Sequence, residues 1–255
     1  MDWYDRAEAY DILCGWDPGP ERDFVLGASE RYGLGPPRRI LEPFCGSGRL
    51  LRVMPGTAIG FDWNPHMVRY ARGRGSRVFR ADAAAFAVRE GSFDLAFCLI
   101  DSFRYLLTEE AAIAHLRGVA RALRPGGVYV LGFEITGDLD RDASIDVWGF
   151  ERDGTRVDGD VRCLDDRAQR VETLRVRLHI RKGRRRERVE TFRPMRVYSR
   201  SDVLALLAAE GSFELAAVSA RGYDLARPVP LASVAGSAAL VLRTAPGAPP
   251  VTCSR

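Results

Sequence analysis

The stretch that decides the fold is Arg39–Leu51, RILEPFCGSGRLL. Two apolar residues are followed by the acidic Glu42 and then by a turn that contains Gly46 and Gly48. Glycine lets the backbone approach a ligand closely, and the first N–H groups of a following helix would face that ligand. The pattern therefore predicts a strand, a glycine turn and a helix start at Arg49, which together form a nucleotide-type cradle. An ordinary strand-to-helix turn also fits, so this stretch alone leaves both interpretations open.

A second acidic residue lies at the spacing that a nucleotide-binding fold requires. The segment Thr57–Met67, TAIGFDWNPHM, predicts a short strand that ends at Asp62, 20 residues after Glu42. In a strand–helix–strand unit, a carboxylate at this place lies at the end of the second strand and accepts both hydroxyls of a ribose. Asn64 and Pro65 then predict the start of the next helix.

The same alternation continues along the chain. A continuous apolar run at Phe93–Leu99 predicts a strand buried on both faces, and a helix over Thr108–Leu123 carries one apolar stripe. Together these segments predict an α/β, doubly wound, mostly parallel, seven-stranded Rossmann-like sheet. The remaining predicted core elements are the strands 78–81, 128–133, 215–219 and 238–243 and the helix 202–209.

At these residues the chain resembles the class I S-adenosylmethionine (SAM) dependent methyltransferases of the small-molecule, sugar and amine N-methylating type. The first motif of that family is an acidic residue followed by x-G-x-G-x-G. Phe44 stands here at the first glycine, so we expect a less tight turn before Cys45. A dinucleotide dehydrogenase would need a packing glycine where Leu51 stands, which favours SAM over NAD. The passage LRPGGVYVLGFE, at 123–134, also resembles these methyltransferases.

The resemblance implies a set of cofactor-binding residues, with SAM as cofactor, S-adenosyl-L-homocysteine as product and no metal. The carboxylate of Asp82 would accept the adenine amino group, although an N-cap for a helix at 83–88 is an alternative. Met67 fits a core position and an adenine contact equally well. The implied residues are Glu42, Phe44, Gly46, Gly48, Asp62, Trp63, Met67, Asp82, Ala83 and Leu99.

Residues 1–35 precede the first predicted strand and are rich in aromatic and acidic side chains. Rings in such a segment often pack a leading helix onto the core, which is one interpretation. The other is an N-terminal helical lid, since similar methyltransferases carry a tyrosine over the bound SAM and acceptor. We assign Tyr10 to that lid. A lid would exclude water from the reacting groups.

Residues 138–198 interrupt the strand–helix alternation. Apolar and polar residues alternate over 174–181, and a second run over 189–198 returns after Lys182-Gly183, which predicts an antiparallel hairpin with a further strand at 161–164. This antiparallel β insertion, at 138–198, follows the fifth strand and is expected to cover the carboxyl edge of the main sheet. The resemblance to the sugar N-methyltransferases implies that it forms a roof over the substrate and a possible homodimer contact. The SAM-binding core then comprises 36–137 and 199–244. A proline-containing tail at 245–255 is expected to be disordered.

Two carboxylates follow predicted strands and are candidate catalytic groups, together with Tyr10. They are Asp101, after the fourth strand, and Glu134, after the fifth. Methyl transfer requires alignment of nucleophile, carbon and sulfur, and a neutral amine needs no strong base. His115 is expected on the surface of a helix and His66 on the first helix after Asp62, both poorly placed for catalysis. His179 is expected on the polar face of a strand and would face the pocket if that side of the hairpin turns inward. The sequence therefore favours N-methylation and leaves O-methylation open.

Other function classes have weaker support in the sequence. EPFCGSG resembles the first motif of DNA amino-methyltransferases, but their Pro-Pro pair after the fourth strand is missing. The formal charge is +4, yet Lys182 is the only lysine and acidic residues are interspersed, so no nucleic-acid partner is expected and the arginine excess is typical of a GC-rich bacterial genome. A catalytically silent SAM-binding scaffold protein is the alternative that Phe44 suggests.

Compartment and partners follow from what the sequence lacks. The five cysteines form no C-x-x-C pair, which fits reduced thiols in a cytosol. The sequence has no signal peptide and no apolar run near 18 residues, so we expect a cytoplasmic protein without membrane insertion. Its expected partner is a small-molecule methyl acceptor.

Overall fold

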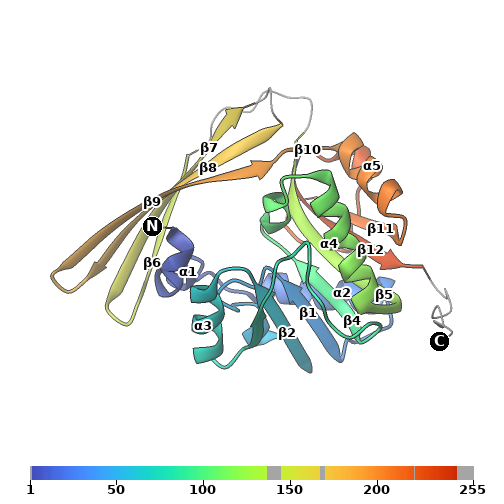
Figure 1. Cartoon of the computed structure of the whole chain (residues 1–255), viewed down its shortest axis with the longest axis horizontal. Coiled ribbons are helices and arrows are strands. Elements are labelled where there is room, and N and C mark those ends of the chain that lie inside the picture. Colours follow the sequence, from blue (N-terminus) through green and yellow to red (C-terminus); the bar gives the residue numbers. More distant parts are fainter. Residues whose placement is uncertain (1, 137–144, 167–169, 221, 246–255) are drawn as a thin grey trace.

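Two sheets form the molecule in this computed structural model, which describes residues 2–136, 145–166, 170–220 and 222–245. Figure 1 shows a large sheet flanked by helices and, on its left, a second sheet of long strands. The large sheet has the strand order β11-β12-β5-β4-β1-β2-β3, with the short β10 paired to β5. Along this order β12 is antiparallel to both of its neighbours, β11 and β5, and the other neighbouring strands are parallel to each other. The prediction of a doubly wound, mostly parallel α/β sheet is confirmed.

The strands of the large sheet include every strand that the sequence predicted for the core. Phe93–Cys98 (β4) is buried along its whole length, as its continuous apolar character predicts. The other strands are β1 (Arg39–Pro43), β2 (Thr57–Asp62), β3 (Arg77–Arg80), β5 (Leu123–Thr136), β10 (Tyr198–Ser199), β11 (Phe213–Ala220) and β12 (Gly236–Thr244).

Helices cover both faces of this sheet because alternate residues of each strand point to opposite sides. Leu95 and Phe97 of β4 pack with Phe24 of α2 (Gly19–Tyr32). Ala96 and Cys98 lie in the cluster that contains α4 (Glu109–Ala122) and α5 (Arg200–Glu210). A further helix on this sheet, α3 (Pro65–Gly73), covers β2 and β3. Both faces of the sheet are therefore buried.

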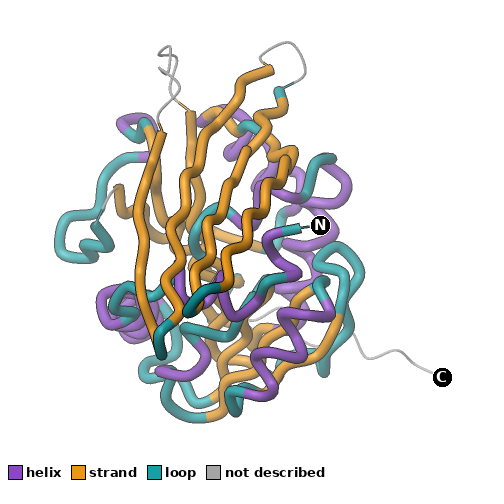
Figure 2. The backbone as a smooth tube through the Cα atoms, turned by 90° about the vertical axis from the view of Figure 1, so that its left-hand side faces the viewer, coloured by secondary structure: helices purple, strands orange, loops and turns teal. Residues whose placement is uncertain are grey.

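The second sheet is antiparallel and has four strands, β6 to β9, in chain order. It confirms the predicted antiparallel insertion after β5 and adds β6, a strand that the sequence analysis missed. Figure 2 shows these long strands with the antiparallel sheet facing the viewer. The first residues of the chain, η1 (Trp3–Asp5) and α1 (Ala7–Leu13), pack against one face of this sheet. The strands are β6 (Ile145–Arg152), β7 (Thr155–Asp166), β8 (Val171–Lys182) and β9 (Arg185–Arg196).

The glycine turn differs from its prediction in two ways. Only the short 3₁₀ helix η2 (Leu51–Val53) follows it, because Pro55 lacks the N–H that a longer helix would need and disfavours helical backbone before it. Phe44 has φ 55°, the left-handed conformation that favours glycine, so its backbone adopts the conformation of the missing glycine and the turn is not loosened there. The cradle is thus a tight loop and not the N-terminus of a long helix.

Three other expectations about local structure need correction or fall outside the description. No helix forms over 83–88, since Asp82 caps only a single turn through Ala84 and Ala85. Two further 3₁₀ turns, η3 (Ser102–Tyr105) and η5 (Leu231–Ser233), were not predicted. Of the expected tail, residues 246–255 lie outside the described residues. Among the helices that the structure describes, none combines the length and apolar character needed to cross a membrane.

Candidate cofactor and acceptor site

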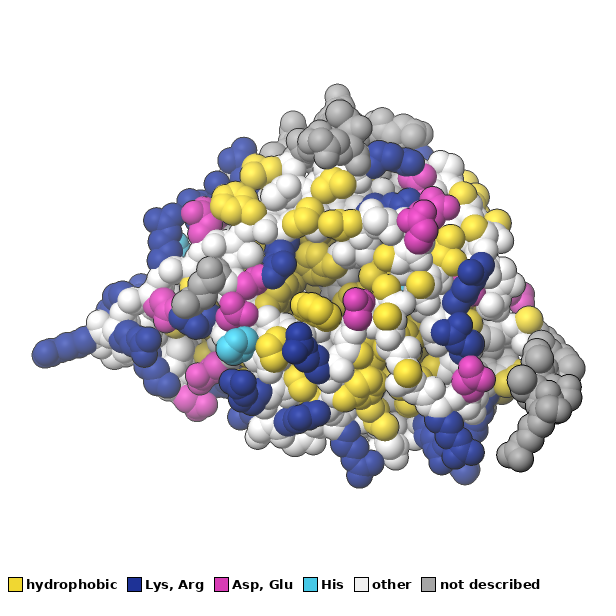
Figure 3. Space-filling model, viewed as in Figure 1, with side chains coloured by type: hydrophobic (Ala, Val, Ile, Leu, Met, Phe, Trp, Pro, Cys, Tyr) yellow, Lys and Arg dark blue, Asp and Glu magenta, His cyan; other side chains and the backbone are white. Residues whose placement is uncertain are grey.

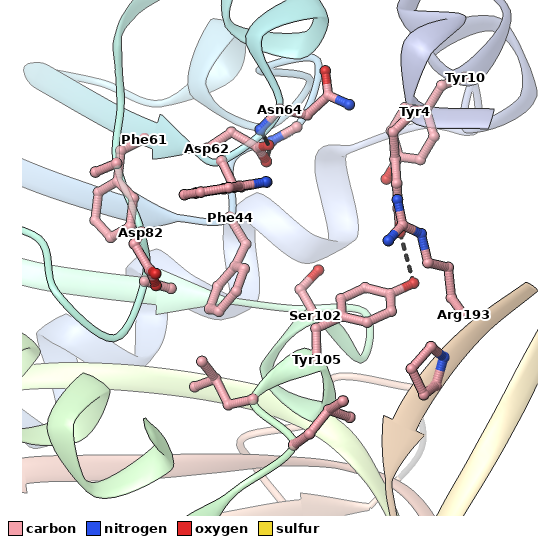
Figure 4. A pocket seen from close by; sticks show the side chains of 17 residues that line it. Tyr4, Tyr10, Phe44, Phe61, Asp62, Asn64, Asp82, Ser102, Tyr105 and Arg193 are labelled. Carbon is pink, nitrogen blue, oxygen red and sulfur yellow. Dashed lines mark hydrogen bonds between the residues drawn. The ribbon is translucent and has the colours of Figure 1, made fainter. Parts of the chain in front are cut away.

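A cavity of about 340 Å³ lies at the carboxyl ends of the central strands, between the large sheet, the N-terminal segment and β9. Figure 3 shows hydrophobic side chains gathered in a hollow on this face of the molecule. In Figure 4, Phe61 and Asp82 lie on one side of the cavity and Tyr4, Tyr105 and Arg193 on the other. The lining residues are Tyr4, Tyr10, Phe44, Gly46, Phe61, Asp62, Trp63, Asn64, Ala81, Asp82, Ala83, Ser102, Tyr105, Leu106, Leu107, Arg193 and Pro194.

Asp62, at the end of β2, is held rigidly in the wall of this cavity. Its Oδ2 accepts the backbone N–H of Gly46 at 2.9 Å, and its Oδ1 accepts that of Asn64 at 2.8 Å. Burial raises the pKa of the carboxyl group, while the two N–H donors act in the opposite direction. The glycine turn therefore fixes the orientation of this carboxylate, which presents its remaining lone pairs to a ligand.

Glu42, at the end of β1, lies beside a smaller cavity of about 50 Å³ that shares Tyr10, Phe44 and Ser102 with the main one. Its Oε2 is buried and has no hydrogen-bond partner among the described residues. Burial raises the pKa of this carboxyl group well above its usual range. A buried acceptor without a donor is costly, so this oxygen is suited to a cationic or N–H group of a ligand.

The end of the cavity at Phe61 and Ala83 is mostly apolar, and His115 lies behind it and contacts the Ala83 backbone. This side chain is fully buried, which corrects the expectation of a surface position on α4. Its Nδ1 lies 2.9 Å from the Ala83 carbonyl and its Nε2 2.9 Å from the Tyr129 hydroxyl. Because a carbonyl only accepts, Nδ1 carries the proton and Nε2 accepts from Tyr129. Burial lowers the pKa of His115 to about 4, so the ring is neutral.

The lid side of the cavity is built from tyrosines. The hydroxyls of Tyr4 and Tyr105 are 2.7 Å apart, and the rings of Tyr4 and Tyr10 lie 5.5 Å apart. Tyr10 also covers the glycine turn, since a Cβ built on Gly46 would lie 3.6 Å from its ring. Arg193 of β9 places its guanidinium 5.9 Å from the centre of the Tyr4 ring and pairs with Asp2. Segments far apart in the sequence therefore close this side.

Comparison with known proteins agrees with this geometry. Residues 40–127 match the family model described as a methyltransferase domain. Over these residues the chain is therefore similar to a methyltransferase domain. The matched range spans the glycine turn, Asp62 and Asp82. The match ends in the first residues of β5, so the antiparallel sheet lies outside it.

Two solved structures share the fold of this chain over most of its length. A SAM-dependent methyltransferase from Clostridium acetobutylicum ATCC 824 is 18% identical, with a TM-score of 0.74 over 96% of this chain and 100% of that one. The sugar N-methyltransferase KedS8 from Streptoalloteichus sp ATCC 53650 is 22% identical, with a TM-score of 0.71 over 91% of this chain and 90% of that one.

One curated relative matches part of this chain in sequence. The tRNA (carboxymethyluridine(34)-5-O)-methyltransferase ALKBH8 of Macaca fascicularis is 36% identical over 94 residues, which cover 35% of this chain. The match spans 14% of the length of that relative.

The fold brings most of the predicted site residues to the two cavities. Glu42, Phe44, Gly46, Asp62, Trp63, Asp82, Ala83, Leu99 and Tyr10 line one or both of them. Gly48 has φ 74° and a Cβ built on it would lie 2.7 Å from the hydroxyl of Ser76, so it shapes the turn from behind. Met67 is fully buried and is not among the lining residues, which places it in the core.

The two predicted catalytic carboxylates lie away from the main cavity. Asp101 accepts the backbone N–H of Glu134 at 2.7 Å and lies 3.6 Å from the guanidinium of Arg104. It lines a separate cavity of about 210 Å³ beside β12. Glu134 is 9% exposed and lies in none of the cavities described above. Their catalytic parts stay predictions, and the geometry brings Asp101 and Glu134 to each other.

Sequence reasoning missed Tyr4, Tyr105 and Arg193, the side chains that close the lid side of the site. Tyr4 belongs to the aromatic segment 1–35, in which only Tyr10 was predicted to form part of the lid. Nothing local marks Tyr105 or Arg193, since each reaches the cavity through contacts between distant segments. Within the described ranges, no group of three or more His, Cys, Asp or Glu side chains is arranged to hold a metal ion.

Proposed function

We propose that this chain transfers a methyl group from SAM to an amine of a small molecule. Two features of the cavity support the proposal together: the rigid Asp62 carboxylate at one side and the lid of neutral tyrosines at the other. SAM supplies an electrophilic methyl group on a sulfonium, so the protein has to align the acceptor and exclude water.

The cavity residues fit the parts of SAM. The carboxylate of Asp62 would accept the ribose hydroxyls, and Asp82, with Ala83, would hold the adenine. The buried Oε2 of Glu42, which has no partner among the described residues, would accept a hydrogen bond from the α-ammonium group of the methionine part of SAM. Tyr10, stacked over the Gly46 turn, would close this end against solvent.

The acceptor half of the cavity favours an amine over a hydroxyl. Its described lining consists of Tyr4, Ser102, Tyr105, Leu106, Leu107, Arg193 and Pro194, without a carboxylate or an imidazole. Burial raises the pKa of Tyr105 to about 12 and that of Tyr4 well above its usual range, so both phenols keep their protons at neutral pH. A hydroxyl acceptor would need a base here, whereas an amine attacks through its own lone pair. The solved sugar N-methyltransferase with this fold is consistent with such an acceptor.

The N-terminal segment and the antiparallel sheet form the acceptor side in this proposal. Residues 2–14 act as the lid, while α2, which packs on β4, β5 and β12, belongs to the core layer. Arg193 and Pro194 of β9 supply the roof. The outer face of the antiparallel sheet is the surface that we propose for a homodimer. We place the enzyme in the cytoplasm, where SAM is available.

The proposal is tested by titrating the purified protein with S-adenosylhomocysteine, with NAD as the control. We expect binding of S-adenosylhomocysteine alone, followed by methyl transfer to a member of an amine panel and not to the matching hydroxyl panel. Binding of neither compound, or of NAD only, would overturn the cofactor assignment. Transfer to hydroxyls alone would overturn the choice of an amine.

A nucleic-acid acceptor is the second candidate, and the tRNA-modifying relative is the observation that favours it. Binding to tRNA that weakens steeply with added salt, together with methyl transfer to it, would replace the small-molecule proposal. A catalytically silent SAM-binding protein would bind S-adenosylhomocysteine and methylate neither class of acceptor.

A further inference from the structure

Asp11 is a buried carboxylate in the middle of α1, next to the cavity residue Tyr10. Its side chain receives hydrogen bonds from four other segments. Oδ1 accepts the Ser47 hydroxyl at 2.6 Å and the Arg52 guanidinium at 2.8 Å. Oδ2 accepts the Tyr70 hydroxyl at 3.0 Å and the Arg152 guanidinium at 2.8 Å. One side chain of the lid thus joins the glycine turn, η2, α3 and β6.

The four donors are also linked to one another, which fixes the geometry around the carboxylate. Arg52 donates a second hydrogen bond to the Ser47 carbonyl at 2.7 Å, and Arg152 donates one to the Tyr70 hydroxyl at 2.9 Å. The Asp11 side chain is 1% exposed, so these charge-assisted hydrogen bonds are shielded from water. Both oxygens have two donors each, and the charge is fully compensated.

The Asp11 carboxylate links α1 to residues that pack on the large sheet. This helix has seven residues and no side-chain hydrogen bond at its N-cap, and a helix this short is marginal on its own. Its apolar residues Ile12 and Leu13 pack with Val157, Val176 and Leu178 of the antiparallel sheet. Apolar packing therefore holds α1 on the antiparallel sheet, and the Asp11 carboxylate links the same helix to Ser47 of the glycine turn.

We propose that Asp11 is a positioning residue that holds Tyr10 over the Gly46 turn and thereby slows the release of the bound cofactor. This inference rests on the proposed function, because it assumes that the cofactor lies between Tyr10 and the turn. Asp11 does not line the cavity and acts only through its neighbours.

The test compares Asp11→Asn with a matched variant, Asp94→Asn. Asp94 is 5% exposed, accepts the backbone N–H groups of Arg38 and Arg39 at 2.9 Å and pairs with Arg124 at the opposite end of the large sheet. Both variants remove one buried charge, so both are expected to lower stability. Only Asp11→Asn should speed the dissociation of S-adenosylhomocysteine, by about tenfold to a hundredfold, the range expected for lost hydrogen bonds to a charged group.

Hydrogen exchange of the ligand-free protein supplies a second readout. We expect faster exchange at residues 7–13 in Asp11→Asn than in Asp94→Asn. If Asp11→Asn does not fold, Tyr70→Phe, which removes one donor to Asp11 and lies outside both cavities, should still speed dissociation. Equal dissociation rates and equal exchange in the two variants would overturn the role of Asp11. A wild-type protein that does not bind S-adenosylhomocysteine would instead overturn the proposed function, and with it this inference.

Discussion

The cavity has two halves that are built in different ways: a proposed cofactor half around Asp62 and Asp82, and a proposed acceptor half around Tyr4, Tyr105 and Arg193. In the cofactor half, the key contacts join Asp62 to backbone N–H groups 16 and 2 residues away. In the acceptor half, Tyr4 meets Tyr105 across 101 residues, and the Trp3 backbone N–H meets Thr191 across 188. The first half follows from the topology of one sheet, whereas the second depends on side chains that bridge two sheets. We therefore expect that a substitution in one half weakens binding of its own ligand and leaves binding in the other half unchanged.

The largest effect is expected from Arg104, which joins the core to the antiparallel sheet. This side chain is 1% exposed and donates to Glu172 of β8 at 2.7 Å and to the Arg196 carbonyl of β9 at 2.9 Å. Arg104→Met leaves buried acceptors without this donor, so the free energy of unfolding should fall by about 3–5 kcal/mol in chemical denaturation. Arg124→Met is the control, because the Arg124 side chain is 44% exposed and Asp94 keeps its two backbone N–H donors. Its loss should cost about 1 kcal/mol or less. Equal losses in the two variants would contradict the bridging role.

His115 supports the cofactor half through the Ala83 carbonyl, and it makes stability depend on pH. Its pKa is about 4 in the folded chain and near 6.5 in the unfolded chain. Between these values only the unfolded chain takes up the proton. The contribution of His115 is therefore complete above pH 6.5 and decreases by about 3 kcal/mol as the pH falls to 4. His115→Gln should remove this part of the pH dependence of unfolding. A variant curve parallel to the wild-type curve would show that the ring is not held neutral.

Asp62→Ala tests the cofactor half alone. The lost charged hydrogen bonds should weaken S-adenosylhomocysteine binding by about 1.5–3 kcal/mol, measured by titration calorimetry. The exposed Asp224, which caps only the backbone at Ala226, provides a control in Asp224→Ala. Unchanged affinity in Asp62→Ala would rule out its assignment to the ribose.

Tyr105→Phe tests the acceptor half and should have the smallest effect. It removes one hydroxyl from the pair with Tyr4 and leaves the ring in place. We expect the KM for the acceptor to rise by a factor that corresponds to about 0.5–1.5 kcal/mol, while S-adenosylhomocysteine affinity is unchanged. A loss of cofactor affinity of the same size would mean that the halves are not separate.

The difference between the halves also explains what the sequence could predict. The order of strands, the glycine turn and Asp62 follow from short-range patterns that a parallel sheet must satisfy. The helix predicted to start at Arg49 is wrong, because Pro55 follows the glycine turn so closely that only the short η2 forms. His115 was placed on the surface although a single buried imidazole is satisfied by Ala83 and Tyr129, neither of which is near it in sequence.

The acceptor half was not predictable in the same way. Asp101 and Glu134 were chosen because they follow strands, yet Asp101 accepts the Glu134 N–H and lines another cavity. Whether a side chain at a strand end turns toward the cavity depends on local backbone, and Ile100 and Asp101 both have positive φ. Tyr105 and Arg193 enter the cavity only because the antiparallel sheet closes against the lid, which no local pattern encodes.

The docking of α1 onto the antiparallel sheet also has a consequence for biosynthesis. Trp3, Ile12 and Leu13 pack with Val176 and with other residues of strands that the ribosome makes much later. During translation these apolar side chains have no native partner on the antiparallel sheet until its strands have left the exit tunnel. The lid therefore leaves the ribosome long before it can dock, and a nascent chain that ends before β9 cannot close its site. Catalytic competence should thus arrive late in synthesis, after the parallel strands β1 to β5 have been made.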